Sequence, residues 1–102
     1  MTVIFTTQAR AQIRAIRAYS HRHFGATTAD LYANALRTTM QDILDPNPAL
    51  GRDRSADIGP GVLSFPANSH LIFYRVVKVG IEILAVVHQK DEPTKYSPLP
   101  AF

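Results

Sequence analysis

The residues best suited to act on a phosphate or a proton lie at the ends of two apolar runs in the second half of the chain. His70 begins the first run, and His88, Gln89 and Lys90 end the second. If the runs pair as an antiparallel hairpin, the start of one lies beside the end of the other, so we expect His70 and His88 to be neighbours. A histidine among cations can bind phosphate or transfer a proton during RNA cleavage. Strand ends are also polar simply because they face solvent, and the sequence favours this second interpretation.

The other charged candidates are three arginines. Arg75 lies inside the first apolar run, where a charge usually faces solvent, pairs with an acid or waits for a partner. Glu82 lies on the facing run, and an ion pair between Arg75 and Glu82 is the interpretation we favour. Arg52 and Arg54 are expected to project from a glycine-rich loop.

Other catalytic signatures are absent from the sequence. It contains no cysteine, no phosphate-binding glycine loop, no zinc-ligand spacing and no G-x-S-x-G nucleophile motif. His21 and His23 are two residues apart on a predicted helix and therefore point in different directions. No pair of carboxylates supports general acid–base catalysis at the strand ends. We therefore expect no metal, no cofactor and no small-molecule substrate.

The two apolar runs predict β-strands over residues 71–77 and 81–87, because β-branched and aromatic residues dominate both. Gly80 can supply the positive φ of a tight turn between them. Apolar residues occupy both odd and even positions, which predicts that both faces of this hairpin are covered. Shorter strands are predicted at residues 2–5 and 62–65.

Two helices are predicted between the first strand and the second, the earlier one over about residues 8–23 and the later one ending before Pro46. Their expected caps are Thr6 or Thr7 for the first and Thr27 or Thr28 for the second, with Asp30 in the first turn of the second. Their expected apolar sides are Ala9, Ile13, Ile16 and Phe24 on the first and Leu31, Ala35, Met40, Ile43 and Leu44 on the second. A different face of the first helix carries Arg10, Arg14, Arg17 and His21.

The resulting order, β-α-α-β-β-β, predicts an α+β fold in which an N-terminal helical hairpin packs on one face of a small antiparallel sheet. A chain of 102 residues forms one domain, which we expect over residues 1–91, with the proline-rich residues 92–102 as an extended or mobile tail. The net charge is +3, and the excess lies in residues 1–54. A basic face can meet an acidic protein, RNA or DNA, but it can also simply be solvated, which the count of charges favours. No signal-peptide or membrane-spanning pattern is present, so we expect a cytoplasmic protein without membrane contacts.

Several segments together resemble the ParE toxins of type II toxin–antitoxin systems. These are Gly51-Arg52, DIGPG at 57–61, Ser64-Phe65-Pro66, HLIFYRV at 70–76, IEIL at 81–84 and VHQ at 87–89. The resemblance covers the chain to about Asp91, and the pair of strand sequences HLIFYRV and ILAVVHQ is its most specific part. It implies the fold that ParE and RelE toxins share, a helical hairpin against a small antiparallel sheet.

The resemblance also implies a function and two partners. ParE toxins are thought to poison DNA gyrase and block replication, whereas RelE relatives cut messenger RNA on the ribosome. Each is neutralised by a cognate antitoxin, whose flexible segment wraps the toxin and would cover otherwise exposed apolar surface.

Two positions favour the ParE branch. RelE nucleases often carry an arginine near the start of the central strand, where this chain has His70-Leu71, and arginine and tyrosine near the last strand. Here that strand ends in His88, Gln89 and Lys90, and the only nearby tyrosine is Tyr96, among prolines. We therefore expect a ParE-like toxin without catalytic residues. The alternative is a RelE-like ribonuclease that uses His70, Arg75, His88 and Lys90, and a third is a toxin fold that has lost toxicity and only binds its partner.

The two expected binding surfaces differ. The surface for the target, gyrase, is predicted to comprise Arg52, Arg54, Arg75, His88, Gln89, Lys90 and the tail beyond. The antitoxin is predicted to lay a helix across Arg10, Arg14, Arg17 and His21, or in the groove beside them. An extended part of it is expected to add to the sheet edge, where open backbone groups invite strand addition.

Overall fold

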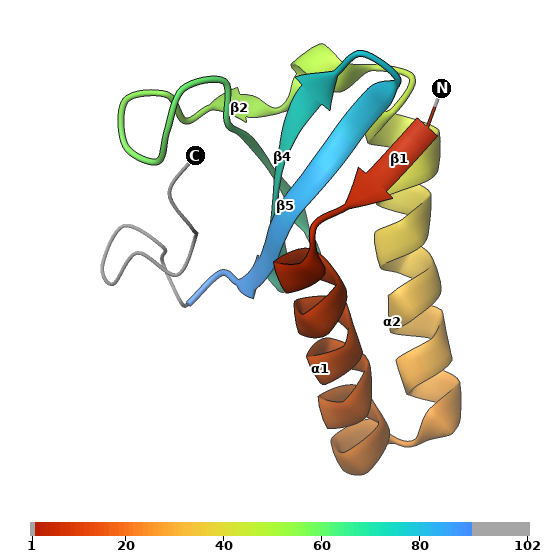
Figure 1. The fold of residues 1–102 in the computed structure, drawn as a ribbon. Coiled ribbons are helices and arrows are strands. Elements are labelled where there is room, and N and C mark those ends of the chain that lie inside the picture. The colour runs from red at the N-terminus through yellow and green to blue at the C-terminus, as the bar shows by residue number, and fades with distance from the viewer. Residues whose placement is uncertain (1, 91–102) are drawn as a thin grey trace.

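The protein folds as two layers, a five-stranded sheet and a helical hairpin that covers one of its faces (Figure 1). The computed structural model describes residues 2–90. The strands are β1 (Thr2–Phe5), β2 (Arg52–Asp53), β3 (Leu63–Ala67), β4 (His70–Val77) and β5 (Gly80–His88). The helices are α1 (Thr7–Phe24) and α2 (Ala26–Thr38), and α2 runs on as a π-helical stretch, Thr39–Leu44, followed by a 3-10 turn, Pro48–Leu50. The predicted α+β fold and the order of its main elements are confirmed.

The sheet has the order β1-β5-β4-β3-β2. β3, β4 and β5 form the predicted antiparallel meander, while β1 joins β5 in parallel at the other edge. The two-residue strand β2 lies in a loop that the sequence predicted to be irregular. The predicted tail, from residue 92 onward, lies outside the described residues.

The turn between β4 and β5 is tight because Val77 pairs with Gly80, which leaves Lys78 and Val79 as the turn residues. Gly80 has a φ of +154°, as the turn prediction required. A second requirement comes from β1: a Cβ on Gly80 would lie 2.0 Å from the backbone oxygen of Thr2. Glycine is therefore needed both for the turn and for the close approach of the first strand.

Thr6 fastens the start of α1 to the sheet. It is the N-cap, as predicted, and its side-chain oxygen accepts a hydrogen bond from the Ala9 N–H at 3.0 Å. The same hydroxyl donates to the Leu84 carbonyl at 2.9 Å, and the Thr6 N–H donates to the Ile83 carbonyl. One threonine thus ends β1, begins α1 and binds β5.

The predicted cap of α2 is wrong. Gly25, with a φ of +89°, occupies the N-cap position, so Thr27 and Thr28 already lie inside the helix. Asp30 lies beyond the first turn and instead pairs with Arg17 of α1 at 2.5 Å. With a single residue between the helices, the glycine conformation replaces the side-chain cap that the sequence predicted.

The core has two parts, one on each face of the sheet. The larger, under the helices, includes Ala9, Leu36, Met40, Leu44, Ile72, Tyr74, Ile81, Ile83 and Val86. The smaller, on the face away from the helices (the far face), contains Val62, Phe73, Leu84, Ala85 and Val87, with Ile58 and Leu71 against it. Both faces of the hairpin are therefore packed, as predicted.

Three residues of the predicted apolar stripes are exposed. Leu31 is 65% exposed, Phe24 64% and Ile43 37%, whereas Leu36, beside the predicted stripe, is a core residue. The buried side of α2 and its π-helical continuation follows Leu36, Met40 and Leu44, each four residues apart. This repeat carries the stripe through the π-helical stretch.

A candidate groove for a partner chain

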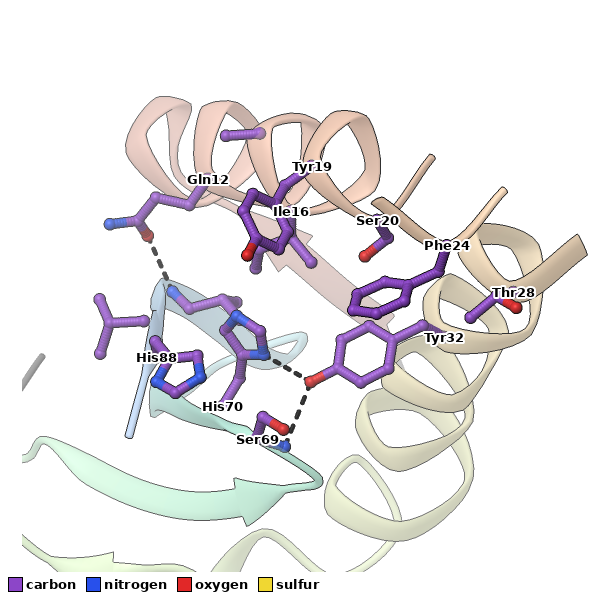
Figure 2. A pocket seen from close by; sticks show the side chains of 13 residues that line it. Gln12, Ile16, Tyr19, Ser20, Phe24, Thr28, Tyr32, Ser69, His70 and His88 are labelled. Carbon is purple, nitrogen blue, oxygen red and sulfur yellow. Dashed lines mark hydrogen bonds between the residues drawn. The ribbon is translucent and has the colours of Figure 1, made fainter. Parts of the chain in front are cut away.

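A groove of about 730 Å³ opens between the helical hairpin and one end of the sheet (Figure 2). It is lined by Gln12, Ala15, Ile16, Tyr19, Ser20, Phe24, Thr28, Tyr32, Ser69, His70, Val86, Val87 and His88. The lining contains large apolar and aromatic side chains, two of which, Tyr19 and Phe24, are more than half exposed. Among residues 2–90, none of those that line the groove is Asp, Glu, Lys or Arg. Such a surface suits an apolar segment of another macromolecule better than a phosphate.

Gln12 of α1 forms the wall beside β5. β1 pairs with β5 only as far as Phe5 and Ile83, so no strand of the described chain lies on that side of the later part of β5. The Gln12 side-chain oxygen accepts a hydrogen bond from the Val86 N–H at 2.8 Å (Figure 2). The side chain therefore satisfies a backbone donor that a longer β1 would have paired.

The ends of β4 and β5 place two histidines at the groove, as the sequence predicted. His70 and His88 are paired residues of the two strands, and their ring centroids lie 5.2 Å apart. Tyr32 of α2 reaches across to them, with its hydroxyl 2.5 Å from His70 Nδ1 (Figure 2). The Ser69 N–H donates to the same hydroxyl at 3.2 Å, and the Lys90 N–H donates to His88 Nδ1 at 3.1 Å. The two hydrogen bonds of the Tyr32 hydroxyl tie α2 to this end of the sheet.

Burial raises the pKa of Tyr32, an effect that the hydrogen bond from Ser69 partly opposes. The phenol therefore keeps its proton at neutral pH and remains able to donate. The sequence pattern offers little warning of this residue, since Tyr32 is only a neighbour of the helical stripe. Phe24, which also lines the groove, lies on α1, and no spacing in the sequence relates it to Tyr32 on α2.

The structure brings together three of the four residues of the ribonuclease alternative, and the fourth, Arg75, lies apart from them. Arg75 Nε binds Glu82 Oε1 at 2.7 Å, which confirms the favoured ion pair. Arg75 lies five positions along β4 from His70, which corresponds to about 16 Å in a strand. The histidine pair, with Lys90 beside it, is therefore separate from Arg75.

The expectation that Arg54 projects from its loop is wrong. Its side chain is 6% exposed and binds both carboxylate oxygens of Asp57, with the closest contact at 2.8 Å. It also donates to the Ser64 hydroxyl at 3.2 Å and lies 5.3 Å from the centre of the Phe73 ring on the far face. The bond from Arg54 lowers the pKa of the Asp57 carboxyl. Arg54 thus holds its loop against the sheet.

The other predicted target-binding residues are exposed but dispersed. Arg52 lies on β2 at the edge of the sheet, and Gln89 and Lys90 follow His88 at the end of β5. Arg75 is at the opposite end of the hairpin. Their role in binding a target stays a prediction.

The predicted antitoxin face is exposed along α1. It consists of Arg10, Arg14, Arg17 and His21. Arg10 lies 5.7 Å from the centre of the Phe5 ring, and Arg17 pairs with Asp30. The groove residues Gln12, Ile16 and Tyr19 come from the same helix, but at about 3.6 residues per turn they lie on a different face of it from the arginines.

The fold and the groove define a class of protein, a small two-layer α+β module with an open, largely apolar groove. The family model for the ParE toxin of the type II toxin–antitoxin system parDE matches residues 3–93, so the chain belongs to the ParE toxin family. The resemblance seen in the sequence is confirmed.

Two relatives illustrate the match. Toxin ParE1 of Caulobacter vibrioides is 33% identical over 82 residues, which are 80% of this chain and 82% of that protein. A chain of the chromosomal ParDE toxin–antitoxin system from P. aeruginosa superposes with a TM-score of 0.71 at 21% identity, covering 86% of this chain and 95% of that one. The second likeness shows that the fold is shared.

Within the described residues, no helix is both long and apolar enough to cross a membrane.

Proposed function

We propose that this ParE-family chain inhibits DNA gyrase by binding it, without catalysing a reaction, and that a cognate antitoxin neutralises it. The observation that carries the proposal is the open apolar groove in a member of this toxin family. Tyr19 and Phe24 expose aromatic area that a resident partner would cover. Both partners reside in the cytoplasm, which is where the proposal places the protein.

The groove is the proposed seat of an antitoxin helix. An amphipathic helix would lay its apolar side on Ile16, Tyr19 and Tyr32. Acidic side chains elsewhere on the antitoxin would meet Arg10, Arg14 and Arg17 on the other face of α1. Beyond Ile83, Gln12 already accepts the Val86 N–H on the side of β5 that no described strand covers. Strand addition is therefore better accommodated along β1 or β2, the outer strands of the sheet.

A groove substitution tests the antitoxin's position. Ile16→Asp places a carboxylate on the partly buried floor of the groove, and we expect it to weaken antitoxin binding by at least tenfold, because a desolvated charge is costly. Ala18→Asp, on an exposed part of the same helix, is the matched control. Equal affinities of the two variants would place the antitoxin elsewhere.

A supercoiling assay with purified toxin and gyrase tests the target. We expect excess toxin to suppress supercoiling and to leave gyrase–DNA complexes, and we expect added antitoxin to restore activity. Unchanged supercoiling at a large excess of folded toxin would contradict the gyrase proposal.

The adjacent histidines keep the ribonuclease as a second candidate. His70 and His88 are placed where an acid–base pair could work, although Arg75 is far from them. Primer extension on messenger RNA after toxin induction distinguishes the two functions. Cleavage linked to codon position would favour the ribonuclease, and intact messages together with arrested replication would favour gyrase.

A further inference from the structure

A buried serine hydroxyl faces the groove from the last part of α1. Ser20 is 8% exposed, which leaves more than nine-tenths of the residue buried. Its side chain lines the groove, and Figure 2 shows the hydroxyl pointing into it. A serine inside a helix often bonds the carbonyl four residues earlier, which here belongs to Ile16. Within residues 2–90, the Ser20 hydroxyl makes neither that hydrogen bond nor any other.

Ser20 differs in this respect from the other polar groups of the groove. The Gln12 side-chain oxygen accepts from the Val86 N–H, and the Tyr32 hydroxyl has two partners at the end of the sheet. These groups are therefore already bound within the chain. Thr28 is an exposed residue, so its hydroxyl can keep contact with water when a partner docks. Ser20 is buried and still lacks a bond.

Water can satisfy the Ser20 hydroxyl while the groove is open. Among the described residues, Asp45 Oδ1 is the side-chain atom that is both fully buried and without a partner, so the Ser20 oxygen keeps some contact with solvent. A chain that covers the groove removes this water. An unpaired hydroxyl buried in the contact would weaken binding by about five- to a hundredfold. A tightly bound partner must therefore supply a hydrogen bond.

The lining limits the chemistry of the group that supplies this bond. Ile16 and Phe24 lie one helical turn before and after Ser20, so the hydroxyl is flanked by apolar side chains on one face of α1. Among residues 2–90, no Asp, Glu, Lys or Arg lines the groove, and an ion placed there would be desolvated without a counter-charge. A neutral hydroxyl or carboxamide on an apolar stem fits both conditions.

We propose that Ser20 is a specificity-determining residue of the groove. The cognate antitoxin helix places a serine, threonine, asparagine or glutamine side chain against its hydroxyl, and a helix that is apolar at this position is rejected. The proposal rests on the proposed antitoxin site. Contacts with Ile16, Tyr19 and Phe24 give affinity for many apolar helices. The buried hydrogen bond selects among them, because a site that bonds a polar group loses affinity when the group is missing.

The first test compares the wild type with Ser20→Ala in binding to the antitoxin encoded beside the toxin. Alanine is a good helix former, and the change breaks no hydrogen bond within the described chain. We expect Ser20→Ala to raise the dissociation constant about tenfold, because the polar group of the antitoxin is left buried without a partner. Thr38→Ala is the matched control, since it removes an exposed hydroxyl outside the groove lining and should bind as the wild type does.

The sign of the effect makes this test decisive. If the antitoxin covers Ser20 with an apolar side chain, removing the hydroxyl removes a desolvation cost, and Ser20→Ala binds as tightly as the wild type or more tightly. Either result would overturn the proposal.

A double-mutant cycle identifies the antitoxin residue and separates a direct bond from a change in groove shape. Each serine, threonine, asparagine and glutamine of the antitoxin helix is replaced by alanine and measured with the wild-type toxin and with Ser20→Ala. We expect one replacement to weaken binding to the wild type about tenfold and to leave binding to Ser20→Ala almost unchanged. Additive effects at every position would contradict a direct bond.

The groove variant Ile16→Asp separates failure of this inference from failure of the proposed antitoxin site. If Ile16→Asp weakens binding while Ser20→Ala does not, only this inference fails. If Ile16→Asp binds normally, the antitoxin does not occupy the groove and both proposals fail.

Discussion

Arg54 is charged, yet it belongs to the packing on the far face of the sheet. Its guanidinium is bound on one side by Asp57 and Ser64 and covers the Phe73 ring on the other. Its backbone carbonyl also accepts hydrogen bonds from the N–H groups of Ile58 and Gly59. The residue therefore organises the loop between β2 and β3, and its effect on toxicity would pass through stability.

Arg54→Ala should destabilise the fold by about 2 kcal/mol, because it removes charge-assisted bonds and packing that are almost fully buried. The free energy of unfolding from urea titration measures this. Arg52→Ala, at an exposed position on β2, should stay within about 0.5 kcal/mol of the wild type.

The pH dependence of the free energy of unfolding gives a second measurement. The lowered pKa of Asp57 gives stability that is present above the ordinary carboxyl range and is lost as the pH falls through the lowered pKa. Arg54→Ala should lack this acid-range loss, and an unchanged acid profile would contradict the assignment.

Asp45 carries a buried carboxylate that is unfavourable for the stability of the fold. It is 7% exposed, and within the described chain its Oδ1 is buried without a hydrogen-bond partner. It also directly follows the π-helical stretch, so its charge opposes the helix dipole. Asp45→Asn removes the charge at nearly constant shape.

We expect Asp45→Asn to stabilise the protein by about 1 kcal/mol, which corresponds to a rise of about 5 °C in the thermal midpoint. Asp42→Asn, an exposed residue of the same stretch, controls for the change in net charge. A lower midpoint for Asp45→Asn than for Asp42→Asn would mean that the carboxylate of Asp45 stabilises the fold.

At the scale of elements, β1 and α1 depend on a few contacts with β5. Thr6 bridges all three elements, and Gly80 allows β1 to approach the turn. Tyr74 joins distant segments toward the other edge of the sheet: its hydroxyl donates to the Pro48 carbonyl and accepts from the Gly51 N–H, just before β2. Single residues thus hold the edges of the sheet. Thr6 and Tyr74 bind the backbone of a distant segment through their side chains, and Gly80 leaves room for one because it has no side chain.

Gly80→Ala should detach or shift β1, because the added Cβ would lie 2.0 Å from the Thr2 carbonyl oxygen and 2.7 Å from its nitrogen. Gly61→Ala separates this clash from backbone strain, since Gly61 also has a positive φ but a Cβ added there would meet nothing within 4 Å. We expect Gly61→Ala to cost about 1 kcal/mol and Gly80→Ala clearly more. Hydrogen exchange of the amides in β1 would show whether the excess is local. Equal losses of stability in both variants would mean that the positive φ, and not the clash with Thr2, explains the effect of Gly80→Ala.

At the scale of the whole molecule, the sequence predicted what depends on local pattern. The strands, their pairing as a hairpin and the juxtaposition of His70 with His88 follow from two apolar runs rich in β-branched residues and one turn. The buried state of Arg54 does not, because its partners Ser64 and Phe73 come from other strands. Tyr32 was missed for the same reason: its contact with His70 joins two elements whose docking no local pattern specifies.

The basic face of α1, which carries Arg14 and Arg17, leads to the final prediction. Arg14→Glu combined with Arg17→Glu should weaken antitoxin binding by about ten- to a hundredfold at low salt, mostly through slower association, because these charges steer an acidic partner. The Arg17 change also removes the ion pair with Asp30, but that pair is more than half exposed and contributes little to stability.

Surface plasmon resonance at low and at high salt measures both rates. The matched control is Arg37→Glu with Lys78→Glu, which makes the same change in net charge at exposed positions away from α1. If the face of α1 steers the antitoxin, the difference between the two double variants should shrink as salt screens the charges. Equal effects would mean that only the net charge of the protein matters, and the antitoxin would then gain its specificity from the groove alone.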